Sequence, residues 1–166
     1  MVTAQVGRPF LPKDYGVPES TEGLLPWEHV TERLAAAKNY WICTTRPDGR
    51  PHATPIWGVF FEGNVYFDGS PETRRGKNLA ANPAITVHLE SGDDVVIVEG
   101  TVTQITPPDR AFAERLAAAY AAKYAALGYS PGAETWDAGG LYRVAHRTVL
   151  AWTTFPADMT RWQFPA

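Results

Sequence analysis

The chain has 166 residues, of which 45% are hydrophobic and 20% charged, so it can bury one sizeable core and is not expected to be disordered. Its net charge of −3 excludes the overall positive surface that general nucleic-acid binding requires. The single cysteine, Cys43, excludes an intrachain disulfide framework and a cysteine-rich zinc site.

The first segment, residues 1–23, contains several Pro and Gly residues and has no hydrophobic period. We expect an extended arm there, ordered only where it packs on the rest of the protein. The segment lacks the basic and then apolar pattern of a signal peptide, and no apolar run in the chain approaches transmembrane length. These patterns predict a soluble, cytoplasmic protein without membrane contact.

The remaining residues, 24–166, are predicted to form a single domain, because no internal repeat, low-complexity tract or second boundary interrupts them. The domain opens with a helix from Pro26, which suits a first helical position, to Lys38. Strands at 40–46 and 51–61 follow, joined by a Pro-Asp-Gly turn, so this pair is predicted to form a β-hairpin.

Pro55 interrupts the second strand of the hairpin. Proline cannot donate a hydrogen bond to a neighbouring strand, so the sequence predicts a sheet edge or a bulge at this position. Such irregularities are common beside binding sites. After a Glu-Gly-Asn turn, a third strand is predicted at 65–68.

The segment after this strand concentrates positive charge at the start of a short helix. The helix is predicted to begin near Thr73 and to end before Pro83, which cannot continue it. Arg74, Arg75 and Lys77 crowd its first turn, where the partial positive charge of a helix N-terminus disfavours cations. An anion would reverse this, because backbone N–H groups, a Thr hydroxyl and guanidinium groups would converge on it.

The competing interpretation of these cations is a solvated basic face. We favour phosphate binding, because the cations lie at the disfavoured helix end and follow a turn. Arg74, Lys77 and Asn78 are predicted to share one helix face, while Leu79 docks inward. A nucleic-acid site is not supported, since no aromatic stripe or recognition helix accompanies the cations.

The rest of the chain returns to strands around one long helix. Thr106 is predicted as the N-cap of this helix, which runs to about Leu127, with Gly128 at its C′ position and Pro and Asp in its first turn. The strands are predicted at 84–90, 95–106, 141–149 and 150–154, the last two of which can equally be one bent strand. Because most strands are joined by hairpins, the pattern favours a mostly β protein with a few helices, an antiparallel barrel rather than a parallel sheet.

The histidines and the cysteine do not predict a metal site or a catalytic nucleophile. His52 and His88 lie on predicted strands, and no carboxylate or second histidine stands at metal-ligand spacing, so no metal site is predicted. His52 is either a strand histidine bonded to a neighbour or, being close to Pro55, a cofactor contact. Cys43 is interpreted as a small hydrophobic residue rather than a nucleophile. The sequence has no G-x-S-x-G, G-x-G-x-x-G or Walker-type motif.

The order of three motifs is similar to that of a known family. They are W-I-C-T-T-R-P-D-G-R-P-H-A-T-P-I-W at 41–57, G-N-V-Y-F at 63–67 and T-R-R-G-K-N-L-A-A-N-P at 73–83, and the segment 151–164 also resembles family C-termini. The chain therefore resembles the pyridoxamine 5′-phosphate oxidase-like, FMN-binding split β-barrels. It looks closest to the branch that uses the deazaflavin coenzyme F420.

The resemblance implies a site, residue by residue. Thr73, Arg74 and Arg75 occupy the family's phosphate-binding positions, although Lys is frequent where this chain has Arg75, and Lys77 and Asn78 lie beside them. The strand segment Thr54, Pro55, Ile56 and Trp57 lies where the family's backbone contacts the tricyclic ring. The resemblance also implies a homodimer with the cofactor in a groove at the subunit interface. We name no catalytic acid or base, because the redox chemistry belongs to the cofactor.

The expected function is hydride transfer between coenzyme F420 and an organic substrate, with FMN as the alternative cofactor. Two rivals remain open: an FMN-dependent oxidase of pyridoxamine phosphate, and a non-catalytic flavin- or deazaflavin-binding protein. The first would need cations for a second phosphate, for which Arg143, Arg147 and Arg161 are available. The large aromatics Trp41, Trp152 and Trp162 are expected in the core or a dimer interface, although Trp162 with Arg161 could also cap a cofactor groove.

Overall fold

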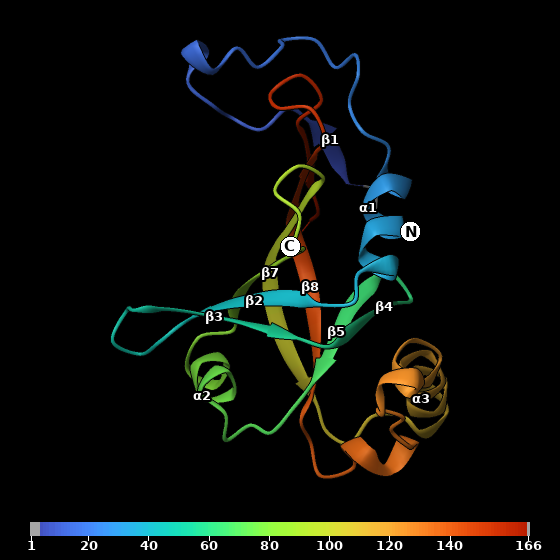
Figure 1. The fold of residues 1–166 in the computed structure, drawn as a ribbon. Helices are drawn as coiled ribbons and strands as arrows, with labels where there is room; N and C mark the ends of the chain where they lie inside the picture. The colour runs from blue at the N-terminus through green and yellow to red at the C-terminus, as the bar shows by residue number, and fades with distance from the viewer. Residues whose placement is uncertain (1–3, 166) are drawn as a thin grey trace.

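The computed structural model of the chain describes residues 4–165. Within this range, nine strands form one antiparallel sheet in the order β1, β9, β8, β7, β6, β2, β3, with the β4–β5 hairpin attached to β8 (Figure 1). The structure confirms the predicted fold class, a mostly β split barrel with small helices.

The elements have the following bounds. The strands are β1 (Gln5–Gly7), β2 (Tyr40–Thr45), β3 (Pro51–Ile56), β4 (Gly58–Phe61), β5 (Asn64–Asp68), β6 (Ala84–His88), β7 (Val95–Ile105), β8 (Leu141–Trp152) and β9 (Thr160–Gln163). The α-helices are α1 (Trp27–Ala36), α2 (Arg74–Ala81) and α3 (Arg110–Tyr124), and the 3-10 helices are η1 (Lys13–Tyr15), η2 (Ala125–Leu127) and η3 (Ala133–Trp136).

The predicted strand 51–61 is two strands, because the chain leaves the sheet at Trp57. Its first part, β3, pairs with β2 alone within the described residues, so β3 forms a free edge. Pro55 lies on this edge, opposite Trp41, where its missing N–H group costs no ladder hydrogen bond. The predicted edge is thus found, and the irregularity lies two residues after Pro55.

The long helix begins later than predicted. Thr106 does not cap it; α3 starts at Arg110, and its N-cap is Asp109, whose carboxylate accepts a hydrogen bond from the Phe112 N–H group at 3.0 Å. The carboxylate caps well because it also complements the helix dipole. At the other end, η2 continues the helix to the positive-φ Gly128, which has the predicted C′ role.

The last two predicted strands form one strand, β8, whose register with β7 shifts between Glu99 and Gly100, because Arg147 of β8 has no partner in the ladder. Gly100 is required there, because a Cβ atom would lie 2.2 Å from the Ala145 carbonyl oxygen. This close approach lets the two longest strands of the sheet stay paired along their whole length.

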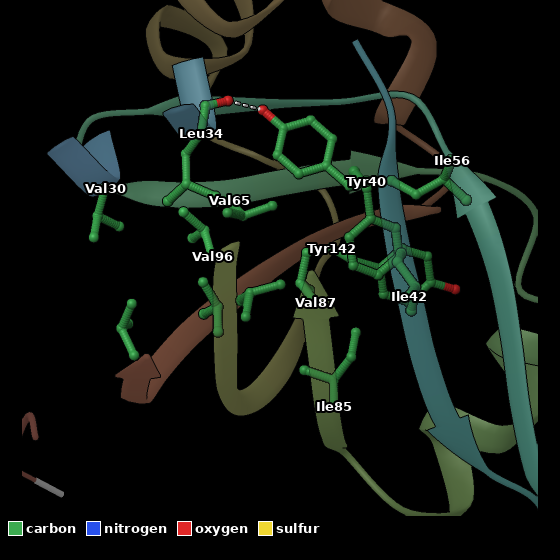
Figure 2. Packing of buried hydrophobic residues seen from close by; sticks show 14 of the residues in the cluster. Val30, Leu34, Tyr40, Ile42, Ile56, Val65, Ile85, Val87, Val96 and Tyr142 are labelled. Atoms are coloured by element: carbon green, nitrogen blue, oxygen red, sulfur yellow. Dashed lines mark hydrogen bonds between the residues drawn. The ribbon is translucent and has the colours of Figure 1, made fainter. Parts of the chain in front are cut away.

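Inward-facing side chains form two hydrophobic clusters. One fills the barrel between α1 and strands β2 to β8 and includes Leu34, Tyr40 and Val87; Figure 2 shows part of it, with the Tyr40 hydroxyl donating to the Leu34 carbonyl. The other lies under α3 and includes Tyr120 and Trp136, which are almost fully buried. The second cluster fixes α3 and the loop after it against β4 and β5.

The N-terminal arm is held by backbone pairing rather than by a core of its own. Its strand β1 pairs with β9, and the Arg8 guanidinium donates hydrogen bonds to backbone carbonyls of the arm and of the loop before β9. This pairing supplies the packing that the sequence required for an ordered arm. None of the helices in residues 4–165 is long and apolar enough to cross a membrane.

Candidate functional site

The start of α2 is fixed by a cap and a close backbone contact. The Thr73 hydroxyl accepts a hydrogen bond from the Gly76 N–H group at 3.2 Å and donates to the Ser70 carbonyl at 2.8 Å. Gly76 packs directly on the preceding turn, since a Cβ atom there would lie 2.4 Å from the Pro71 carbonyl oxygen. The Thr73 hydroxyl is therefore occupied by the cap, whereas the sequence suggested that it would face an anion.

The three cations of this helix differ in their surroundings. Arg74 and Lys77 are exposed, and Lys77 forms an ion pair of 3.2 Å with the exposed Glu72. Arg75 is half-buried: its Nη2 atom donates to the Asp68 carbonyl at 3.2 Å, while its Nε–H group is buried without a partner in the described structure. Gly69 makes room for the guanidinium, because a Cβ atom there would lie 2.2 Å from Nη2.

Asn78 is fully buried and docks α2 against the sheet. Its side-chain amide donates to the Thr44 hydroxyl at 2.9 Å, and that hydroxyl lies 3.5 Å from Nδ1 of His52. Asn78 thus lies inside the protein, whereas Arg74 and Lys77, its neighbours on the helix surface, face solvent, so the three residues do not form one exposed face. Leu79 docks inward, as the sequence predicted.

A hollow of about 320 Å³ lies between β3 and α2, lined by Pro55, Ile56, Trp57, Arg75, Asp68 and Tyr129. The first four are predicted site residues, and the structure brings them together from two elements. Trp57 stacks on Tyr124, with ring centroids 4.9 Å apart, and lies outside both strand ladders. Its backbone N–H and C=O groups form no backbone hydrogen bond within residues 4–165.

Two lining residues, Asp68 and Tyr129, were missed by the sequence reasoning, and so was their neighbour Trp136. The Asp68 carboxylate accepts hydrogen bonds from the Tyr129 hydroxyl and, at 3.1 Å, from the Trp136 indole N–H group. Burial and this bond to Asp68 raise the pKa of Tyr129, so its hydroxyl stays protonated. The only local signals were a carboxylate before Gly69 and two aromatic residues in a loop.

The loop that carries these aromatics encloses a second hollow of about 400 Å³ beside the first. Its walls are Asp68, Gly69, Ser70, Pro71, Tyr129, Thr135, Trp136, Ala138, Gly139 and Gly140. The two hollows share Asp68 and Tyr129. A backbone hydrogen bond of 2.9 Å from the Gly69 N–H group to the Gly140 carbonyl joins the strand end to the loop.

The other predicted residues lie around or away from the hollows. His52 and Thr54 are half-buried on β3 and line neither hollow. Arg143 and Arg147 are exposed on β8, while Trp162 is buried in the barrel core. Arg161 is on β9, which pairs with β1, and β1 lies at the opposite end of the chain's fold from α2 (Figure 1).

The residues 4–165 contain no group of three His, Cys, Asp or Glu side chains that could hold a metal ion. The charged groups that remain at the hollows are Asp68 and Arg75. The arrangement can therefore hold a flat ring against Trp57 and an anion beside Arg75, but it offers no ready metal centre.

Residues 26–154 match the family model described as pyridoxamine 5′-phosphate oxidase. No curated protein matches the sequence. Among solved structures, the chain is similar to the conserved hypothetical protein Rv2991 from Mycobacterium tuberculosis, with a TM-score of 0.66 and 17% identity over 80% of this chain and 88% of that one. It is also similar to an F420 reductase, with a TM-score of 0.54 and 24% identity over 78% of this chain and 98% of that one. A third similar structure is a FAD-binding protein from Mesorhizobium loti, with a TM-score of 0.57 and 19% identity over 83% of this chain and 95% of that one.

Proposed function

The chain belongs to the pyridoxamine 5′-phosphate oxidase family, and on this premise we propose that it is an oxidoreductase that transfers a hydride between coenzyme F420 and an organic substrate. One observation carries the proposal: the free edge at β3, the ring of Trp57 and the guanidinium of Arg75 meet in one hollow. A phosphorylated tricyclic cofactor needs an aromatic side chain to lie against, unpaired backbone groups for the polar edge of its ring and a cation for its phosphate.

The residues present fit such a cofactor. The buried Nε–H group of Arg75 lacks a hydrogen-bond acceptor in the described chain, and a phosphate oxygen would supply one. The backbone N–H and C=O groups of Trp57, which have no backbone partner there, are suited to the polar edge of the ring. When bound, the deazaflavin supplies the hydride chemistry. The protein's own residues would hold the ring, bind the phosphate and limit access of water.

The exposed cations favour F420 over FMN. Arg74 and Lys77 lie outside the hollow, where they would serve a longer anionic tail better than the single phosphate of FMN. An F420 reductase is among the structures that share the fold. Arg75 would bind the phosphate of FMN equally well, so the cofactor has to be determined by titration.

Different observations bear on the two alternative functions, pyridoxamine phosphate oxidation and non-catalytic cofactor binding. Oxidation of pyridoxamine phosphate would need cations for a second phosphate, yet neither hollow is lined by a Lys or Arg other than Arg75. A non-catalytic protein would use the same hollow, and a FAD-binding protein is among the structural neighbours. Reduced F420 mixed with the protein and candidate acceptors separates this rival, because a storage protein would hold the reduced cofactor without oxidising it.

We further propose a homodimer formed through the outer face of the sheet. Direct strand pairing lines up a row of exposed or half-exposed side chains across this face: Pro55, Trp41, His88, Ile97, Leu150 and Arg161. The neighbouring row, which includes Ile42, Val87 and Val98, is buried in the barrel. In a two-fold dimer with the rows running in opposite directions, the Pro55 end of one protomer would meet the Arg161 end of its partner. The hollow would then lie at the interface.

The test is a fluorescence titration of the purified protein with F420 and with FMN. We expect F420 to bind more tightly, and we expect R75A to weaken binding about tenfold or more, because a charge-assisted contact contributes about 1.5–3 kcal/mol. The double variant R74A/K77A should also weaken F420 binding. The control is R115A, which removes an exposed arginine of α3 that forms an ion pair with Glu62. This variant should leave the affinity for F420 unchanged.

Three results would change the proposal. Unchanged affinity in R74A/K77A would show that these cations do not bind the tail. Tight binding of FMN alone would reverse the order of the two cofactors. Binding of neither cofactor would contradict the proposed function.

A further inference from the structure

The residues that line the second hollow carry no positive charge. Of its ten lining residues, none is Lys or Arg, and the single charged group is Asp68. Both hydrogen bonds that the Asp68 carboxylate accepts, from Tyr129 and Trp136, go to its Oδ2 atom. Its Oδ1 atom has no such donor in the described structure, so one carboxylate oxygen remains able to accept a hydrogen bond from a ligand.

The walls of this hollow are suited to a flat group. The rings of Tyr129 and Trp136 are held in place by their hydrogen bonds to Asp68, and Tyr120 packs against both, with centroids 5.9 and 5.8 Å away. Gly69 and Gly140, which carry no side chains and are joined by a backbone hydrogen bond, also line the hollow. Rings that are already held in place can contact a planar ligand with little further loss of conformational freedom in the protein.

The position of the hollow relates it to the proposed cofactor. It shares Asp68 and Tyr129 with the hollow that holds Trp57 and Arg75, so a molecule in it would lie next to the ring of the cofactor. We propose that this second hollow is the substrate site, and that it selects flat substrates that carry no negative charge and present an N–H donor or a positive charge to Asp68. This inference rests on the proposed function, whose cofactor would occupy the first hollow.

The charge of Asp68 sets the selectivity. An anionic group placed beside its carboxylate would be repelled and would find no cation on the walls. A cationic or amide N–H group would form a charge-assisted hydrogen bond with the free carboxylate oxygen, and a cationic group would add attraction between opposite charges. Phosphorylated and carboxylated substrates are therefore excluded, and Asp68 acts in binding rather than in the chemical step.

Three probes of almost equal size test this selectivity: benzamidine, benzamide and benzoate, which are cationic, neutral and anionic at neutral pH. Binding is followed by NMR through the indole N–H signal of Trp136, assigned by its loss in W136F, with and without saturating F420. We expect benzamidine and benzamide to shift the signal, with benzamidine binding about tenfold more tightly than benzoate. D68N, which removes the negative charge, should reduce this preference for benzamidine over benzoate.

The control is E134Q, which makes the same carboxylate-to-amide change on an exposed residue of the same loop that does not line the hollow; it should keep the wild-type preference. Failure of any probe to shift the Trp136 signal, or equal binding of benzoate, would overturn the inference. F420 titrations of the same samples report on the first hollow separately. F420 binding without probe selectivity would overturn only the substrate site, and probe selectivity without F420 binding would overturn only the proposed function.

Discussion

Arg75 differs in its environment from an ordinary surface arginine, and it shares its buried, unpaired Nε–H group with Arg46 and Arg161. One of its nitrogens is hydrogen-bonded to the Asp68 carbonyl, while its buried Nε–H group lacks a partner in the described residues. A buried donor without an acceptor costs about 1–3 kcal/mol, a cost that a bound anion removes. Arg74 and Lys77 are solvated and carry no such cost, so their contribution should be smaller and more sensitive to salt.

Lys123 is a second residue with an unusual environment. Its ammonium group donates to the Tyr40 hydroxyl at 3.0 Å and to the Gly58 carbonyl at 3.1 Å and forms no ion pair within residues 4–165. Burial lowers its pKa from 10.5 to about 8. Between these values the unfolded chain binds more protons than the fold, so this residue makes the free energy of unfolding rise with pH.

The prediction concerns the difference in the free energy of unfolding between wild type and the K123M variant. Wild type should gain stability relative to K123M as the pH rises from 8 to 9.5, measured by urea denaturation. The window ends there because burial raises the pKa values of Tyr40 and Tyr124, and their ionisation in the unfolded chain would lower stability above pH 10. Parallel pH profiles of the two proteins would show that Lys123 is already solvated in the fold.

At the level of elements, α2 depends on a glycine that the sequence alone did not single out. Alanine at a helix position normally stabilises by about 1 kcal/mol relative to glycine. At Gly76, however, the new Cβ atom would meet the Pro71 backbone at 2.4 Å, and overpacking of this kind costs about 1–3 kcal/mol. We expect G76A to lower stability in urea denaturation and to weaken F420 binding, because the turn and Arg75 would move.

The matched control is G92A. Gly92 lies in the turn between β6 and β7, and a Cβ atom added there meets nothing within 4 Å. Its effect on stability should stay within about 0.5 kcal/mol. A stabilised G76A variant would mean that the turn before α2 can move aside without loss.

The elements also show where sequence reasoning succeeds and where it stops. Hydrophobic alternation and turn residues located the strands, and the proline at position 55 located the sheet edge, because these signals are local. The cap of α3 was missed because Thr106 still follows the β7 strand and Asp109 offers the stronger cap. The hydrogen bonds from Tyr129 and Trp136 to Asp68 span more than sixty positions, so no local pattern could predict them.

The same limit applies to the candidate site. The motifs predicted Pro55, Ile56, Trp57 and Arg75 as site residues, and the structure places all four around one hollow. Burial within the helix was harder to predict, since Asn78 has the spacing of a surface residue but hydrogen-bonds to Thr44 inside the protein. A polar side chain that anchors a helix and one that binds a ligand have the same sequence signal.

For the whole molecule, the outer face of the sheet bears on its assembly. The outer face of the sheet leaves Trp41, His88 and Ile97 half-exposed in one row, and Trp41 lies parallel to His88 with centroids 6.2 Å apart. A monomer would leave this row in water, whereas a two-fold dimer would bury it and add the area that a stable interface needs. The proposed dimer therefore predicts that one charge in the middle of the row is enough to disrupt it.

Ile97 is at the centre of the row, so I97E should convert a dimer into a monomer, because a buried glutamate without a partner is costly. Analytical ultracentrifugation measures the mass, and circular dichroism checks that the fold is kept. F10E changes an apolar residue of the arm that is 88% exposed and lies outside the row, so it should remain dimeric. Since the hollow would lie at the interface, the I97E monomer should also bind F420 more weakly; a wild-type monomer, or a folded I97E dimer, would contradict this assembly.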